Sequence, residues 1–188
     1  NIEAGTEIIT NASRNNSNHT LIIWMGQNGG YNEDANILIE QYRSMINKNG
    51  NDNYIIIGIP TGTKDSRPEL ETAMKNAFGN KYINIREYMT KPIYENDILI
   101  SCQALQDCNL TATDEDLQLI EQGTIPATLR TDSIHGNSFY YTIVAQQVYK
   151  KGVELGYWNE NNKESYILAS AATETSTTSK SDRSHVVL

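Results

Sequence analysis

Asp132 and His135 are spaced as a carboxylate and an imidazole that can bond to each other. They stand in the tetrapeptide Asp132-Ser133-Ile134-His135, just before a predicted helix. In non-helical backbone, a carboxylate three residues before an imidazole can accept the Nδ1–H and so fix the tautomer and orientation of the ring. The pair predicts a general base and the residue that orients it. A capping aspartate followed by a surface histidine would have the same spacing, so the spacing alone leaves both interpretations open.

A glycine-rich turn, Gly26-Gln27-Asn28-Gly29-Gly30, follows the first predicted strand. A glycine at a strand exit lets the backbone turn tightly, and the next residues can then point a polar side chain into a ligand crevice. The side-chain amide of Asn28 would offer an N–H donor to a developing negative charge. The turn is not a dinucleotide-binding loop, because the pattern G-x-G-x-x-G is absent. An ordinary glycine-rich turn is the alternative interpretation.

The elements that must position these two motifs alternate between strands and helices. The predicted strands are residues 20–25, 54–59 and 81–85, and the predicted helices are residues 33–47, 68–78, 113–122 and 138–155. Residues 20–25 and 54–59 are continuously apolar, which is typical of strands buried on both faces of a parallel sheet. Residues 91–113 have no sustained period and are predicted to be an irregular insertion, and residues 126–137 are predicted to be a loop.

This alternation predicts βαβ units and hence a parallel α/β sheet with right-handed crossovers. Ligands of such sheets bind outside the carboxyl ends of the strands. The turn at Gly26 lies at a strand exit, and the Asp132–His135 pair lies just before the closing helix. Both motifs are therefore expected on loops of one sheet.

Together the two motifs resemble the SGNH, or GDSL-type, hydrolase family over about residues 1–158. Gly26 and Asn28 match the G-x-N block of that family, and Asp132 and His135 match its D-x-x-H block. The resemblance implies a three-layer α/β/α sandwich of the flavodoxin-like type. It also implies a serine esterase acting on an acyl ester, such as the O-acetyl group of a carbohydrate. His135 would be the general base, Asp132 its orienting carboxylate, and Asn28 an oxyanion donor beside Gly26 and Gly29, with no metal or cofactor required.

The sequence departs from this family in its missing nucleophile, since no Gly-Asp-Ser occurs anywhere in the chain. Gly29 and Gly136 also replace the usual aspartate and leucine. We expect that the nucleophilic serine lies in an N-terminal segment outside this chain. One alternative is a non-catalytic binding or scaffold module of the same fold. Another is a circular permutation in which residues 166–169 form the missing strand and Ser170 is the nucleophile.

Length and composition limit the class of protein. The chain has 188 residues, enough for one domain with a substantial core. Its 15 Lys+Arg and 23 Asp+Glu give a net charge of −8, which argues against a nucleic-acid partner. No apolar run reaches the roughly 18 to 20 residues that span a bilayer. The composition indicates a soluble protein and fits a secreted or a cytoplasmic one equally.

Two further features complete the organisation of the chain. Residues 159–188 are rich in Ser and Thr and are predicted to be a tail or linker after the hydrolase-like domain of residues 1–158. Cys102 and Cys108 are too few for a disulfide scaffold or a structural zinc site, and a single bridge or two reduced thiols are both open.

The run 20–25 would lie beside the family's missing central strand, so its edge would be bare. We expect the missing N-terminal segment or a second chain to cover it, because a bare apolar edge is a template for aggregation. Residues 1–158 expressed alone should therefore be poorly soluble or self-associate, as measured by size-exclusion chromatography with light scattering. A monomeric fragment that unfolds cooperatively would contradict this expectation.

Overall fold

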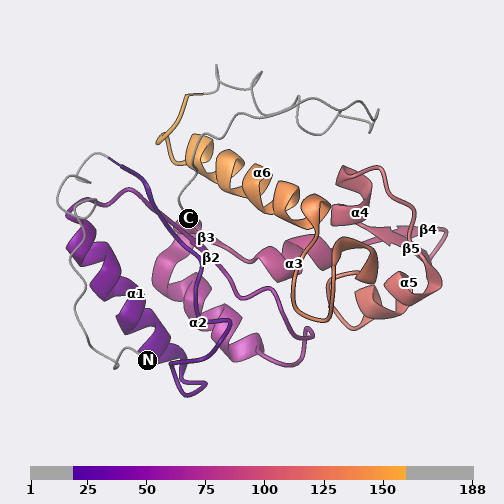
Figure 1. Cartoon of the computed structure of the whole chain (residues 1–188), viewed down its shortest axis with the longest axis horizontal. Helices are drawn as coiled ribbons and strands as arrows, with labels where there is room; N and C mark the ends of the chain where they lie inside the picture. Colours follow the sequence, from indigo (N-terminus) through magenta and orange to yellow (C-terminus); the bar gives the residue numbers. More distant parts are fainter. Residues whose placement is uncertain (1–18, 160–188) are drawn as a thin grey trace, which may run out of the picture.

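The computed structural model describes residues 19–159, and it shows a mixed α/β architecture (Figure 1). The strands are β1 (Leu21–Ile23), β2 (Tyr54–Ile57), β3 (Tyr82–Ile83), β4 (Pro92–Glu95) and β5 (Ile98–Cys102). The helices are α1 (Ala35–Asn49), α2 (Pro68–Phe78), α3 (Ile85–Thr90), α4 (Gln103–Asp107), α5 (Asp114–Glu121) and α6 (Ser138–Glu154), with the 3₁₀ helices η2 (Gly79–Lys81) and η3 (Ala127–Leu129). Ser170 and the run 166–169 lie outside the described residues.

The predicted parallel sheet is present, with the strand order β1-β2-β3. Leu21 is in register with Tyr54, and Ile56 with Tyr82. Side chains alternate across β2: Ile56 packs with apolar residues of α1 and α2, whereas Ile55 and Ile57 pack with residues of α6. Helices therefore cover both faces of β2, as its continuous apolar sequence predicts. The prediction of a parallel α/β fold is confirmed at this level, while the larger sandwich of the SGNH type stays a prediction.

Burial of β1 on both faces was a wrong prediction. Ile23 is only 2% exposed on the α1 side, but Ile22 is 45% exposed and Met25, just past the strand, is 53% exposed. The reason is the position of β1 at the edge of the sheet, since α6 packs mainly on β2 and β3. An apolar run therefore marks a strand here without marking complete burial.

The prediction of an irregular insertion at residues 91–113 was also wrong. This segment contains the antiparallel hairpin β4–β5, in which Glu95 pairs with Ile98, followed by α4. Asn96 and Asp97 make the two-residue connection, with φ values of 49° and 64°. Both are residue types that tolerate left-handed backbone, so an Asn-Asp pair between two apolar runs is a hairpin signal.

The two cysteines of this region are both free thiols. Cys102 is fully buried at the end of β5, in the core that α6 covers, and Cys108 packs at the margin of the same core. Burial raises the pKa of both thiols above the ordinary value. Their environment is therefore that of apolar packing residues and not of activated nucleophiles.

Asp116 is a charged side chain in the interior, with no exposed surface. Its carboxylate accepts hydrogen bonds from the backbone N–H and hydroxyl of Thr113, at 3.0 and 2.9 Å. It also accepts bonds from the backbone N–H and hydroxyl of Thr128, at 3.0 and 2.6 Å. Burial alone would raise the pKa of this carboxyl, but the bonds from Thr128 and Thr113 outweigh burial and lower it below the usual value. Asp116 thereby fastens the start of α5 to η3.

Replacing Asp116 with asparagine should reduce the free energy of unfolding by about 2 to 4 kcal/mol, because an amide cannot accept at both positions and leaves buried donors unpaired. Urea denaturation would measure this change. Asp114→Asn is the matched control, since Asp114 is exposed in the first turn of the same helix and should change stability by less than about 0.5 kcal/mol. Equal effects of the two substitutions would contradict the anchoring role.

The pH dependence of stability follows from the lowered pKa of Asp116. A carboxyl whose pKa is lower in the folded than in the unfolded chain stabilises the fold above its unfolded pKa, about 3.9. That contribution is lost as the pH falls through the folded pKa. The loss of stability below about pH 4 should therefore be smaller in Asp116→Asn than in the unmodified protein.

Candidate functional site

Asp132 and His135 form a side-chain pair in the loop before α6. The His135 Nδ1 lies 2.8 Å from the Asp132 Oδ2. The His135 side chain is 68% exposed and the Asp132 side chain 54% exposed. The ring is therefore held through one nitrogen while most of its surface is open to solvent. This is the arrangement that a general base needs before its reaction partner arrives.

The other oxygen of Asp132 organises the backbone of the same turn. Its Oδ1 accepts hydrogen bonds from the backbone N–H groups of Ile134 and His135, each at 2.7 Å. These bonds and the contact with the His135 ring lower the pKa of Asp132 to about 2, with the backbone bond from His135 as the largest cause. The carboxylate is ionised at neutral pH, and its geometry is fixed at both oxygens.

The loop that carries this pair is closed at its base. Arg130 and Gly136 form an isolated antiparallel bridge, and the Thr131 N–H donates to the His135 carbonyl at 2.9 Å. Asn137 caps α6 and also bonds to the carbonyl of Thr128 through its side chain, at 2.8 Å. Because Thr128 is held by the buried Asp116, the loop is attached to the core through a continuous set of hydrogen bonds.

Gly136, directly after the histidine, is tightly packed. A Cβ built at Gly136 would collide with the ring of Tyr140, which lies one turn into α6. Tyr140 is buried and could not move aside without disturbing the core. A larger side chain therefore does not fit at this position, and glycine is required by the local packing.

The turn after β1 has the form that its glycines predict. The Gly29 N–H donates to the Gly26 carbonyl at 3.1 Å, and both glycines have positive φ, at 92° for Gly26 and 82° for Gly29. Asn28 stands exposed in the middle of this turn. Its neighbour Gln27 accepts a hydrogen bond from the hydroxyl of Thr61, at 2.9 Å, in the loop after β2. Gln27 thus ties two adjacent strand exits together, a contact between loops that the sequence did not indicate.

Aromatic contacts bring the two motifs to the same end of the molecule. Trp24, at the exit of β1, stacks on Tyr140 with ring centroids 6.3 Å apart and meets Tyr141 edge-on at 6.2 Å. Trp24 precedes Asn28 by four residues, and Tyr140 follows His135 by five. The exit of β1 and the first turn of α6 are consequently packed against each other at the carboxyl end of the sheet (Figure 1).

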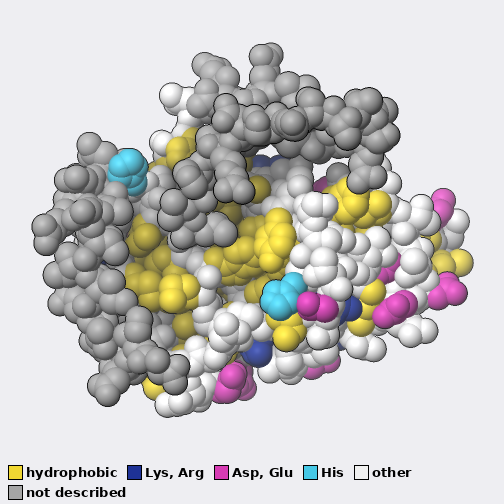
Figure 2. Space-filling view, in the orientation of Figure 1, with side chains coloured by type: hydrophobic (Ala, Val, Ile, Leu, Met, Phe, Trp, Pro, Cys, Tyr) yellow, Lys and Arg dark blue, Asp and Glu magenta, His cyan; other side chains and the backbone are white. Residues whose placement is uncertain are grey.

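Exposed apolar side chains surround this contact. We define the β1–α6 patch as Ile22, Trp24, Phe139 and Tyr141. Ile22, Phe139 and Tyr141 are 45%, 44% and 48% exposed, and Trp24 is partly exposed. Figure 2 shows hydrophobic side chains gathered on this face of the molecule. The candidate site therefore borders apolar surface that the described residues do not cover.

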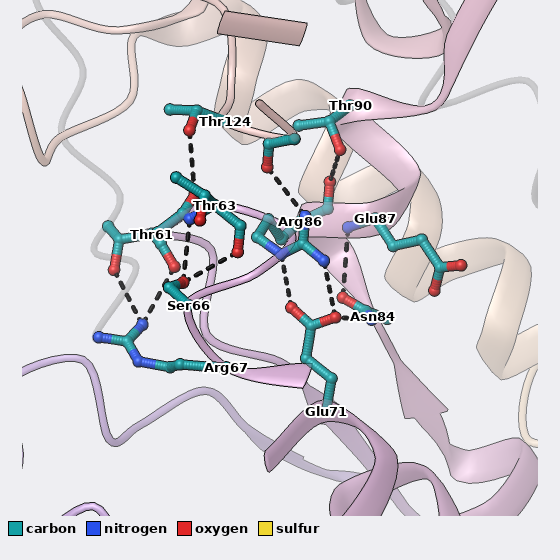
Figure 3. A network of polar contacts seen from close by, with 12 residues as sticks. Thr61, Thr63, Ser66, Arg67, Glu71, Asn84, Arg86, Glu87, Thr90 and Thr124 are labelled. Carbon is teal, nitrogen blue, oxygen red and sulfur yellow. Dashed lines mark hydrogen bonds and ion pairs between the residues drawn. The ribbon is translucent and has the colours of Figure 1, made fainter. Parts of the chain in front are cut away.

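A broad cleft of about 1190 Å³ lies elsewhere, beside β3 between α2, α3 and α6. Neither Asn28 nor the Asp132–His135 pair lines it. Within it the buried Arg86 pairs with Glu71, with Nη2 and Oε2 2.7 Å apart, and also donates to the Gly123 carbonyl at 2.8 Å (Figure 3). Asn84 donates to the same glutamate at 2.8 Å. Arg86 is thereby occupied in joining α2, α3 and the segment after α5, so we assign this cluster a structural role.

Comparisons with known proteins do not add to this geometry, since no family model, no curated protein and no solved structure matches the chain. Within residues 19–159, no group of three or more His, Cys, Asp or Glu side chains is arranged to hold a metal ion. In the same range, no helix combines the length and apolar character needed to cross a membrane. The roles of the site residues accordingly rest on the site itself.

The lowered pKa of Asp132 can be observed at the amides that it binds. The backbone N–H resonances of Ile134 and His135 should show no titration of this carboxyl between pH 5 and 3.5, because it remains ionised there. An NMR titration of these two amide resonances measures this directly. A transition of the Ile134 amide with a midpoint near pH 4 would show that the Asp132 bonds are absent in solution.

Proposed function

We propose that this chain carries the base, the orienting acid and one oxyanion donor of a serine ester hydrolase. The observation that carries the proposal is the 2.8 Å contact between His135 Nδ1 and Asp132 Oδ2, in a loop with an exposed ring at the carboxyl end of a parallel sheet. Clefts outside this end of α/β sheets are where ligands bind. The substrate class that suits these groups is an acyl ester, such as an O-acetylated carbohydrate.

In the proposed reaction, the Nε2 of His135 takes the proton of a serine hydroxyl while the serine oxygen bonds to the ester carbonyl carbon. The carbonyl oxygen becomes an oxyanion, which the side-chain N–H of Asn28 would stabilise. His135 then gives the proton to the departing alcohol oxygen, which leaves an acyl-serine that water hydrolyses by the same two steps. Asp132 remains ionised throughout, consistent with its pKa of about 2, and stabilises the imidazolium.

The nucleophile is expected outside the described residues. Within residues 19–159, the ring of His135 bonds to Asp132 and to no serine hydroxyl. The exposed side of the ring leaves room for a serine supplied by another segment. The β1–α6 patch supports the same view, because it provides an uncovered apolar surface next to the loop on which such a segment can pack.

A non-catalytic binding module of the same fold is the second candidate. The absence of Gly-Asp-Ser favours it, as does the apolar patch, which a bound partner could cover. The two candidates differ in one respect that can be measured, namely whether His135 is needed for ester turnover.

The test is hydrolysis of p-nitrophenyl acetate by the full-length gene product. His135→Ala should lower kcat/KM by about 10³-fold or more, and Asn28→Ala by about 10²-fold to 10³-fold. His19→Ala is the matched control, since His19 is the other histidine of the described residues and is exposed at their start. Turnover that is unchanged in His135→Ala would remove this residue from the mechanism, and a full-length protein without turnover would favour the binding module.

The nucleophile can be identified in the same preparation. A fluorophosphonate probe should label one serine outside residues 19–159, and labelling should be lost in His135→Ala, because the serine then lacks its base. Mass spectrometry of the labelled peptide would name the residue. Labelling that persists equally in His135→Ala would contradict the proposed pairing.

A further inference from the structure

We propose that residues 166–169 of this chain add to the free edge of β1 as a parallel strand. These residues, Tyr166-Ile167-Leu168-Ala169, form the longest apolar run in residues 160–188. Docking of this strand is independent of the esterase proposal. It depends only on the free edge of β1, the β1–α6 patch and the position where the described chain ends.

The edge of β1 that faces away from β2 has no strand partner among residues 19–159. The Leu21 N–H donates to the Asn53 carbonyl at 2.8 Å, so the backbone groups of Leu21 point toward the β2 side. Backbone groups of successive strand residues point to opposite sides. The N–H and C=O of Ile22 are therefore directed outward, where an added strand can bind them.

The surroundings of this edge select an apolar, uncharged occupant. Residues 20–30 contain no Asp, Glu, Lys or Arg, although the whole chain carries a net charge of −8. The β1–α6 patch flanks the edge on the α6 side, with Ile22 and Tyr141 nearly half exposed. An apolar strand on this edge would cover the patch and satisfy the outward N–H and C=O groups at the same time.

The described chain ends beside the start of β1. After α6, the hydroxyl of Tyr157 donates to the Asp52 carbonyl at 3.2 Å, and the next residue, Asn53, is the one that binds Leu21. The chain therefore reaches the amino end of the sheet at Tyr157, two residues before the described part ends. The six residues 160–165 can span up to about 20 Å when extended, which is enough to reach the edge of β1.

A strand that starts at this end of the sheet runs toward the carboxyl end, parallel to β1. Four residues extend over about 13 Å, a length that matches the short β1.

Amide hydrogen exchange in the full chain tests the docking. The Ile22 amide should be protected in the unmodified protein and should exchange at least about 10-fold faster in the double variant Ile167→Asp/Leu168→Asp, because two charges cannot enter the apolar edge. Val186→Asp/Val187→Asp is the matched control, with the same two charges in a different apolar stretch of residues 160–188, and should leave Ile22 protected. The Ile23 amide, which faces β2, should stay protected in all three proteins and shows that the variants are folded.

The proposal is overturned if the Ile22 amide is unprotected in the unmodified protein, or if the Ile167→Asp/Leu168→Asp variant leaves its protection unchanged. Protection that rises with protein concentration and survives the substitutions would identify a second copy of the chain as the occupant. These readouts need no substrate, so failure of docking and failure of the esterase proposal are distinguishable.

Discussion

The candidate site depends on one buried carboxylate. Asp116 has no exposed surface and binds the backbone and hydroxyl groups of Thr113 and Thr128. A charge in this position is tolerated because every partner is an aligned donor, and the loss of any one would leave an uncompensated polar group in the interior. Thr128 in turn accepts a bond from Asn137, which caps α6. The loop that carries Asp132 and His135 lies between η3 and α6, and it is thus attached to the core through this carboxylate.

A second constraint joins the loop to the sheet. The stacking of Trp24 on Tyr140 holds the exit of β1 against the first turns of α6, and the tight approach of Tyr140 to Gly136 fixes the backbone just after the histidine. These contacts leave apolar surface exposed along β1, because α6 packs mainly on β2 and β3. The same arrangement therefore positions the candidate catalytic groups and creates an edge that another segment can complete.

Local signals predicted the framework of the molecule well. The parallel strands and the long helices on either side follow from apolar runs and helical periods. The side chain of Asp34 caps the start of α1, and Gly50, with left-handed backbone, ends it. The hairpin β4–β5 was missed because its turn uses Asn96 and Asp97 in place of glycine, and α3 was missed because it is short and directly follows a strand. The exposed face of β1 could not be predicted, since an apolar sequence does not tell which helix will lie above it.

The sequence by itself determined which chemical groups are available, because spacing within a few residues fixes contacts such as the turn of Asp132 with His135 and the glycine turn around Asn28. Only the tertiary structure decided that Trp24 packs on Tyr140, that Gln27 bonds to Thr61, and that Arg86 is occupied by Glu71. The physical reason is how far apart along the chain the contacting residues lie. Hydrogen bonds within a turn depend on neighbouring residues, whereas contacts between distant segments arise only when burial of the shared core has fixed the elements in place.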